Sequence, residues 1–257
     1  MTRVISGVAL AAAALAAILY LPDFALRVLA CVVAGLAAHE FLTIAGIDGG
    51  RSNLPIAVVV VCCAVASARF DAHYEVIAAA LLALVGLGVL AGDWRLSDGT
   101  AGAFASLYVG VSLGMLVAIH ARYGARATLL IIGAVVVSDS AQYYTGRAFG
   151  RRPLAPAISP KKTVEGAVGG VLFGTLFMAL AGTAALPVFG YAVYAALGAT
   201  IVVFGICGDL FESRLKRSAG MKDSSALIPG HGGVLDRIDA LLFAVPAFYG
   251  FLRVMGP

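Results

Sequence analysis

The densest run of polar residues in this sequence lies between Gly208 and Asp239. Asp209 follows a long apolar stretch, while Asp236 and Asp239 precede the next one and, three residues apart, share a face if they are helical. Carboxylates near a membrane interface are costly unless they are paired or bind a metal. Clustered carboxylates beside phosphate are typical ligands of Mg²⁺, which prefers oxygen. The pattern therefore indicates a site for a divalent metal and a phosphate group.

Glycines and cations complete this polar run. Gly230, Gly232 and Gly233 flank His231 just before an apolar segment, where they allow unusual backbone angles and close approach by a ligand. The helix N-terminus beyond them can offer N–H groups to an anion. Interleaved cations suit charge neutralisation on a transferring phosphoryl group. The alternative, a basic loop that only sets topology or attracts anionic lipid, explains the charges but not the glycines, the histidine and the ordered carboxylates.

Two motifs resemble the phosphatidate cytidylyltransferase family. The first, from Ser213 to Asp239, looks like the family signature over 27 positions without a departure. The second, Ser138 to Gly166, is similar to a family stretch with an acid late in a helix and a Ser-Pro-x-Lys-Thr-x-Glu-Gly element; Gln142 is a minor departure there. A weaker aromatic-Glu element of the family is matched at residues 38–41. Histidine replaces the usual tryptophan in it, so Glu40 is left out of the predicted catalytic set.

The resemblance implies a reaction and a set of roles. A phosphatidate oxygen attacks the α-phosphorus of CTP and pyrophosphate leaves, with no covalent protein nucleophile required. Mg²⁺ is expected on Asp209 and Asp236, and a second, monovalent ion such as K⁺ is conceivable. Asp139 either lines the site or pairs with a structural arginine, and His231 either contacts substrate or caps the glycine turn. The predicted catalytic residues are Asp139, Asp209, Lys222, Asp223, His231, Asp236, Arg237 and Asp239. The predicted substrate-binding residues are Ser159, Lys161, Lys162, Thr163, Ser213, Lys216, Arg217, Ser224, Gly230, Gly232 and Gly233.

The elements that must position these residues are membrane helices. The chain has 257 residues, of which 61% are hydrophobic and 12% charged, with a mean hydropathy of +0.98. Soluble domains average roughly 45–50% apolar and about 25% charged. Backbone that faces lipid must satisfy its own hydrogen bonds, so the expected fold is all-α and polytopic, with about nine transmembrane helices. The nine apolar segments run over residues 4–21, 24–46, 54–68, 74–91, 100–119, 127–145, 164–186, 191–207 and 239–255.

Further features predict the arrangement of these segments. Val4–Leu21 is interpreted as a retained first helix, because no small-residue cleavage site follows it. Small residues recur every four positions, at Gly110 and Gly114 and in residues 166–174, which predicts close helix packing. The four cysteines lie in apolar segments and are expected to be packing residues. One membrane domain spans 1–257, with residues 1–120 as a scaffold and 121–257 as the catalytic half.

The distribution of cations predicts an orientation. Two long polar loops, Gly146–Thr163 and Gly208–Arg237, hold ten of the 18 Lys and Arg residues. With nine spans and a cytoplasmic N-terminus, thirteen cations face the cytoplasm and five the other side, as the positive-inside rule favours. The expected location is therefore the bacterial inner or plasma membrane, with the active face cytoplasmic.

The expected partners are CTP, phosphatidate and membrane lipids, with no nucleic acid, and glycine-rich helix faces make a homodimer plausible. One alternative is a CTP-dependent transferase acting on another lipid phosphate, either an ether lipid or a polyprenyl phosphate. A transporter is disfavoured because no half-to-half repeat is visible and the polar groups concentrate at one membrane face. A CDP-alcohol phosphotransferase is disfavoured because its Asp-Gly-x2-Ala-Arg run is absent.

Overall fold

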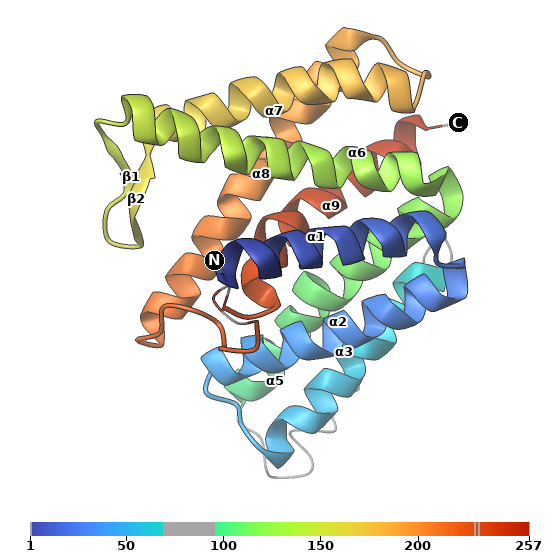
Figure 1. The fold of residues 1–257 in the computed structure, drawn as a ribbon. Helices are drawn as coiled ribbons and strands as arrows, with labels where there is room; N and C mark the ends of the chain where they lie inside the picture. The colour runs from blue at the N-terminus through green and yellow to red at the C-terminus, as the bar shows by residue number, and fades with distance from the viewer. Residues whose placement is uncertain (1, 69–95, 229, 231, 257) are drawn as a thin grey trace. The chain divides into compact units, whose positions relative to one another are not determined.

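The computed structural model describes residues 2–68, 96–228, 230 and 232–256 (Figure 1). Within them the chain is almost entirely helical, with one two-stranded antiparallel sheet, β1–β2. The elements are α1 (Thr2–Tyr20), α2 (Asp23–Ile44), α3 (Gly50–Ala68), α5 (Leu96–Ala105), the π-helix η1 (Ser106–Val111), α6 (Ser112–Phe149), β1 (Pro153–Ala155), β2 (Ser159–Thr163), α7 (Val164–Ala185), α8 (Tyr191–Ser218) and α9 (Leu235–Met255).

The chain divides into two compact units. The first comprises Met1–Arg122 and Ser218–Ile238, and the second comprises Tyr123–Arg217 and Asp239–Pro257. The first boundary falls beside Gly124, whose φ of 75° and ψ of −176° interrupt α6. A positive φ of this kind is readily adopted only by glycine. The polar segment 218–238 belongs to the same unit as the N-terminal helices. The predicted division of roles between a scaffold, residues 1–120, and a catalytic half, residues 121–257, stays a prediction.

The chain is a polytopic membrane protein, but the prediction of nine spans is wrong. The described residues contain six helical stretches long and apolar enough to cross a membrane: 23–44, 50–68, 98–149, 164–185, 191–218 and 235–255. Helix α1 has 19 residues, Thr2–Tyr20, and rises about 28 Å at 1.5 Å per residue, against a hydrocarbon core of about 30 Å. The part of it whose side chains are described, Ser6–Tyr20, is a shorter apolar helix that is not counted among the six. The fifth and sixth predicted segments, 100–119 and 127–145, lie within the stretch 98–149 on either side of the break at Gly124. The fourth, 74–91, lies outside the described residues.

The two polar loops are shorter than predicted because helices extend into them. Residues 146–149 continue α6, and the β1–β2 hairpin follows, with Pro153 paired to Thr163 and Ala155 to Ser159. At the second loop, α8 continues to Ser218, eleven residues beyond the predicted end at Cys207. Hydropathy falls at Asp209, but the polar residues beyond it recur at helical spacing, so the helix persists after the apolar segment ends.

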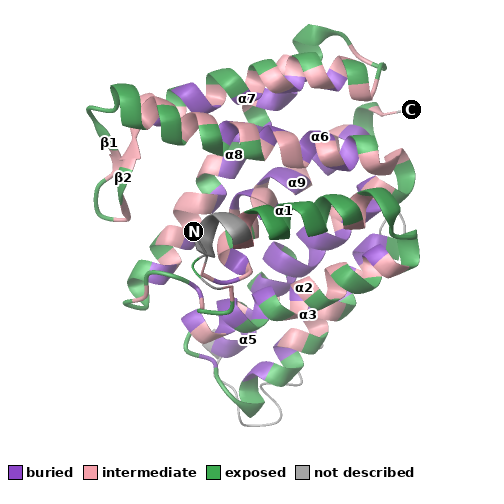
Figure 2. Ribbon diagram, viewed as in Figure 1, coloured by how far each residue is buried: buried purple, intermediate pink, exposed green. Residues whose placement is uncertain are grey.

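In the first unit, α2, α3, α5 and η1 pack against one another. Gly110 and Gly114 face α3, where a Cβ at either position would overlap backbone or side-chain atoms, so the predicted close packing is confirmed. Phe41 of α2 stacks on Phe104, with ring centroids 5.8 Å apart. Figure 2 shows α1 coloured mostly as exposed, and its exposed side chains are apolar, as expected of a surface that faces lipid.

In the second unit, α7 has two contrasting faces. The buried face carries glycines, and a Cβ at Gly170 would overlap Gln142 while one at Gly174 would overlap Val202. The exposed face carries a stripe at four-residue spacing, Val168, Leu172, Leu176 and Leu180, each at least half exposed. Small residues inward and large apolar residues outward are the pattern of a lipid-facing helix, because packing rather than hydrophobicity holds it to its neighbours.

Candidate active site

The polar segment of the first unit is organised around Glu40, near the C-terminal end of α2. This carboxylate is only 4% exposed. Its Oε1 accepts hydrogen bonds from the Ser225 hydroxyl (2.7 Å) and the Val234 N–H (3.0 Å). Its Oε2 accepts from the Ser224 hydroxyl (2.9 Å) and the Leu235 N–H (2.8 Å). A buried charge with four donors is well compensated, so Glu40 fixes both ends of the segment that contains the glycines.

Asp236 closes the same segment from within. Its Oδ2 accepts hydrogen bonds from the Ser224 N–H (2.9 Å) and the Gly233 N–H (2.8 Å). It also lies 2.9 Å from the Ser224 hydroxyl, whose single proton it shares with Glu40 Oε2. Gly232 has a φ of 77°, and a Cβ there would overlap the Asp236 carboxylate. A Cβ at Gly233 would overlap both Ser224 Oγ and the Glu40 carboxylate. The Gly-Gly pair is thus required by the turn that brings backbone up to two carboxylates.

The second unit brings together three acids and a lysine. Asp139 of α6, Asp209 of α8 and Asp239 of α9 lie close enough for their charges to interact. Lys162 of β2 forms an ion pair with Asp209 Oδ2. The Gln142 amide donates to Asp139 Oδ1 over 3.0 Å, and the Ser213 hydroxyl donates to Asp209 Oδ1 over 3.4 Å. Three helices and the hairpin therefore contribute to one acidic cluster with a cation against it.

The hairpin that carries Lys162 is held to the start of α7. Thr163 is the N-cap, and its hydroxyl accepts a hydrogen bond from the Gly166 N–H over 3.1 Å. Glu165 Oε2 accepts from the N–H groups of Arg151 (3.0 Å) and Arg152 (3.2 Å), which begin the hairpin. The N-cap bond of Thr163 contributes about 1 kcal/mol. The Lys-Thr-x-Glu element thus places one lysine against Asp209 and anchors the strand that bears it.

Helix α8 presents a second ion pair, this one buried, one turn beyond Asp209. Glu212 is fully buried, and Lys216 donates to its Oε2 over 3.1 Å at i,i+4 spacing. Lys216, predicted to bind substrate, is only 9% exposed. Arg217, also a predicted substrate contact, donates from Nε to the Ile158 carbonyl at the hairpin tip over 3.4 Å. Both cations therefore have structural partners in addition to any role toward substrate.

The other predicted residues divide between the two units. Ser159 and the exposed Lys161 lie on β2, while the exposed Lys222, Asp223, Gly230 and Arg237 belong to the first unit. His231 lies outside the described residues. Asp209 belongs to the second unit and Asp236 to the first, so the prediction that they share a metal ion stays a prediction.

Sequence reasoning missed three glutamates that position this machinery: Glu40, Glu165 and Glu212. For Glu40 and Glu212 a signal was present, because an acid inside an apolar helix is costly and therefore functional or structural by default. Glu40 was set aside because His39 departs from the family pattern. Its partners are 184 to 195 residues away in the chain, a separation at which one sequence gives no indication of contact.

The acidic cluster fits Mg²⁺ in the chemistry of its donors. All three acids offer carboxylate oxygens, the ligands that this hard cation prefers. Among the described residues no three acidic, histidine or cysteine side chains are already arranged as a metal site, and Asp209 is paired with Lys162. A metal ion at Asp209 would therefore either displace Lys162 from this carboxylate or share the carboxylate with it.

Comparison with known proteins agrees with this chemistry. Residues 1–255 match the Cytidylyltransferase family. The chain belongs to this family. It is accordingly a cytidylyltransferase-family enzyme of the membrane, and the predicted family membership is confirmed.

Several bacterial proteins are similar to this cytidylyltransferase-family chain. A phosphatidate cytidylyltransferase of Aquifex aeolicus is 40% identical over 169 residues, which are 66% of this chain and 63% of that protein. One of Thermotoga maritima is 37% identical over 59% of this chain and 58% of its own length. A third relative, the uncharacterized protein YnbB of Escherichia coli, is 40% identical over 54% and 46% of the two chains. The matched regions thus span about half to two thirds of these relatives.

Proposed function

We propose that this chain transfers the cytidylyl group of CTP to phosphatidate, giving CDP-diacylglycerol and pyrophosphate. The observation that carries the proposal is the cluster of Asp139, Asp209 and Asp239 with Lys162 against it, on elements that bear the family motifs. The names of the similar bacterial proteins support phosphatidate as the acceptor.

In the proposed reaction, a phosphatidate oxygen forms a bond to the α-phosphorus of CTP. The bond between that phosphorus and the oxygen bridging to the β-phosphate breaks, and pyrophosphate departs with the electron pair. Both reactants are polyanions, so fixed cations must offset their repulsion and the charge that grows on the leaving group. Lys162 has this role in the second unit, where its charge already lies against a carboxylate, and Lys161 is the neighbouring exposed cation.

Asp209 and Asp239 would hold Mg²⁺ in the second unit. When bound, this ion would supply a concentrated positive charge to the phosphate oxygens. The chain's own residues set the geometry: Ser213 orients Asp209, and Glu165 anchors the strand of Lys162. In the first unit, Glu40 and Asp236 hold the Ser224–Gly233 turn in one shape, so that a substrate meets a preformed loop.

The reaction is proposed to occur at the cytoplasmic face of a bacterial inner membrane, because CTP is cytoplasmic and basic loops favour that side. Single cysteines placed at Lys161 and Lys222, in a variant without native cysteines, should be protected from impermeant thiol reagents in intact cells. They should react once the cells are opened. Labelling of either position from outside would exclude this orientation.

The direct test is turnover by the purified full-length chain. Labelled CTP and phosphatidate should yield labelled CDP-lipid together with one pyrophosphate per lipid formed. An ether-linked analogue and a polyprenyl phosphate, assayed in parallel, test the acceptor. Product only with one of these other acceptors would overturn phosphatidate as the substrate, and pyrophosphate release without a lipid product would overturn the transfer reaction itself.

A further inference from the structure

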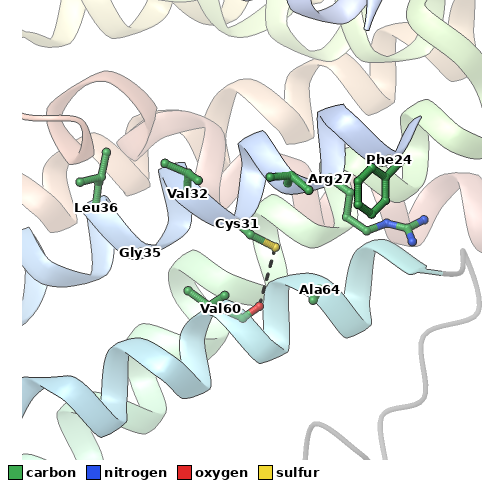
Figure 3. A pocket seen from close by; sticks show the side chains of 9 residues that line it. Phe24, Arg27, Cys31, Val32, Gly35, Leu36, Val60 and Ala64 are labelled. Carbon is green, nitrogen blue, oxygen red and sulfur yellow. Dashed lines mark hydrogen bonds between the residues drawn. The ribbon is translucent and has the colours of Figure 1, made fainter. Parts of the chain in front are cut away.

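A groove runs along α2 and α3 of the first unit, away from the loop that Glu40 organises. Its volume is about 580 Å³, within the range of about 300–1,000 Å³ that is typical of small-molecule sites. On the α2 side it follows Val28, Val32 and Leu36, each at least 40% exposed and spaced one helical turn apart. Val60 and Ala64 of α3 form the other wall (Figure 3). The groove is therefore long, apolar and open to whatever surrounds these helices.

Among the nine lining residues, Arg27 is the only charged one. Figure 3 shows it beside Phe24 at one end of the row of apolar side chains. Its Nε is buried and has no hydrogen-bond partner among the described residues. A buried guanidinium N–H without an acceptor is costly, so this end of the groove is complementary to an anion.

Among the described residues, no ion pair joins Arg27 to its neighbouring acid on α2, Asp23. Asp23 lies one turn earlier on α2, where it could pair with Arg27 across the helix surface. Instead its Oδ1 lies 3.6 Å from Nδ1 of His120, whose Nε2 is 2.9 Å from the Ile18 carbonyl. Within the described part of the chain the Arg27 Nε therefore has no acceptor, and a ligand would supply one.

The position of Arg27 indicates a ligand at the membrane surface. It lies in the second turn of α2, close to the short α1–α2 turn, where Tyr20 is 82% and Phe24 74% exposed. Aromatic residues and arginine at a helix end are typical of the headgroup region. Glu40, thirteen residues further along α2, is about 20 Å away along the helix axis. Arg27 and the Glu40-organised loop thus lie toward opposite faces of the membrane.

From this geometry we propose that the groove binds one anionic phospholipid of the leaflet opposite the Glu40-organised loop. Arg27 binds the headgroup phosphate through its guanidinium, and an acyl chain lies against Val28, Val32 and Leu36. An acyl chain fits the groove because its walls are apolar along their length, and the single cation selects the headgroup. This lipid is not the acceptor of the proposed reaction, because the groove's charged end is remote from that loop. The site is independent of the function proposed above.

The test uses the full-length chain in nanodiscs that contain equal amounts of phosphatidylcholine and phosphatidylglycerol, followed by native mass spectrometry. The wild-type chain should retain one phosphatidylglycerol in preference to phosphatidylcholine. Arg27→Gln should lower that retention about tenfold, as expected for loss of a charge-assisted bond. Arg27→Lys should keep most of the preference. Arg126→Gln, at an exposed arginine of α6 outside the groove, is the matched control and should leave it unchanged.

A second variant tests the groove with the arginine intact. Ala64→Leu fills the α3 wall and should reduce severalfold the cross-linking of α2 by phosphatidylglycerol with a photoreactive group in its acyl chain. Cross-linked peptides should contain residues 24–36. Equal retention of both lipids by the wild-type chain would overturn the proposal. So would equal losses in Arg27→Gln and Arg126→Gln, or undiminished cross-linking of α2 in Ala64→Leu.

Discussion

Glu40→Gln is the substitution that most sharply tests how the Glu40-organised loop is held. Each carboxylate oxygen of Glu40 accepts one hydroxyl and one backbone N–H. In glutamine one of these oxygens becomes an NH₂ group. The hydroxyl facing it can reverse and accept, but the backbone N–H of Val234 or Leu235 cannot, so a buried donor is left facing a donor.

The magnitude follows from these bonds. An unsatisfied buried donor costs about 1–3 kcal/mol, and the remaining bonds change from charge-assisted to neutral, which weakens each by about 1 kcal/mol. Because neighbouring bonds are not additive, we expect the ordered loop to lose roughly 2–4 kcal/mol. The loop can lose part of this free energy and still remain ordered in most molecules. The expected loss in kcat/KM for the proposed reaction is therefore between about tenfold and a thousandfold.

The assay is pyrophosphate release in detergent micelles with phosphatidate, accompanied by limited trypsin digestion of the folded protein. Glu40→Gln should speed cleavage at the exposed Lys222 while the helices stay protected. His39→Gln, at the exposed neighbouring position of α2, is the matched control and should leave both measurements unchanged. Turnover and digestion of Glu40→Gln within twofold of the wild type would refute the role of Glu40 in ordering the loop.

Three further sets of substitutions test the acidic cluster, the hairpin and the glycine turn. Asp209→Asn and Asp239→Asn should each lower turnover by several orders of magnitude. The double variant should be scarcely worse, because residues that act as one unit are not additive. Near-normal turnover of Asp239→Asn at ordinary Mg²⁺ would remove Asp239 from the metal site. Lys162→Ala should lower kcat/KM for CTP roughly ten- to hundredfold. Lys161→Ala, at an exposed position, should lower it less. Unchanged kinetics in both variants would show that the cations of the hairpin only set the orientation of the chain in the membrane. Gly232→Ala should loosen the loop and lower turnover at least tenfold, through a positive φ and overlap with the Asp236 carboxylate; wild-type turnover would show that the turn can relax.

The sequence alone was sufficient to predict the family, the helical membrane fold and the residues of the two motifs. These depend on composition and on local spacing, both of which one sequence displays. The ends of α8 and α6 were misjudged because hydropathy marks where apolar residues stop and not where hydrogen bonding stops. The break at Gly124 lies between the predicted segments 100–119 and 127–145, so the sequence indicated the boundary but not the positive φ of the glycine that forms it.

The partners of individual acids could not be predicted. Lys162 and Asp209 are 47 residues apart, and Glu40 and Ser225 are 185 apart, so neither pairing leaves a periodic signal. Asp236 was predicted as a metal ligand from its place in the signature. The structure adds that its Oδ2 holds the loop, a role that residue type and position alone could not reveal.

The sequence separation between Glu40 and its hydrogen-bond donors also determines when these bonds can form during synthesis. Ser224 is synthesised 184 residues after Glu40, and Leu235 is 195 residues after it. At about 5–20 residues per second, the ribosome needs roughly 10–40 s to deliver the donors that this carboxylate requires. During that interval α2 carries an uncompensated acid, which must stay hydrated or protonated. Nascent chains that end before the signature loop should therefore be the forms most readily taken by membrane quality-control proteases.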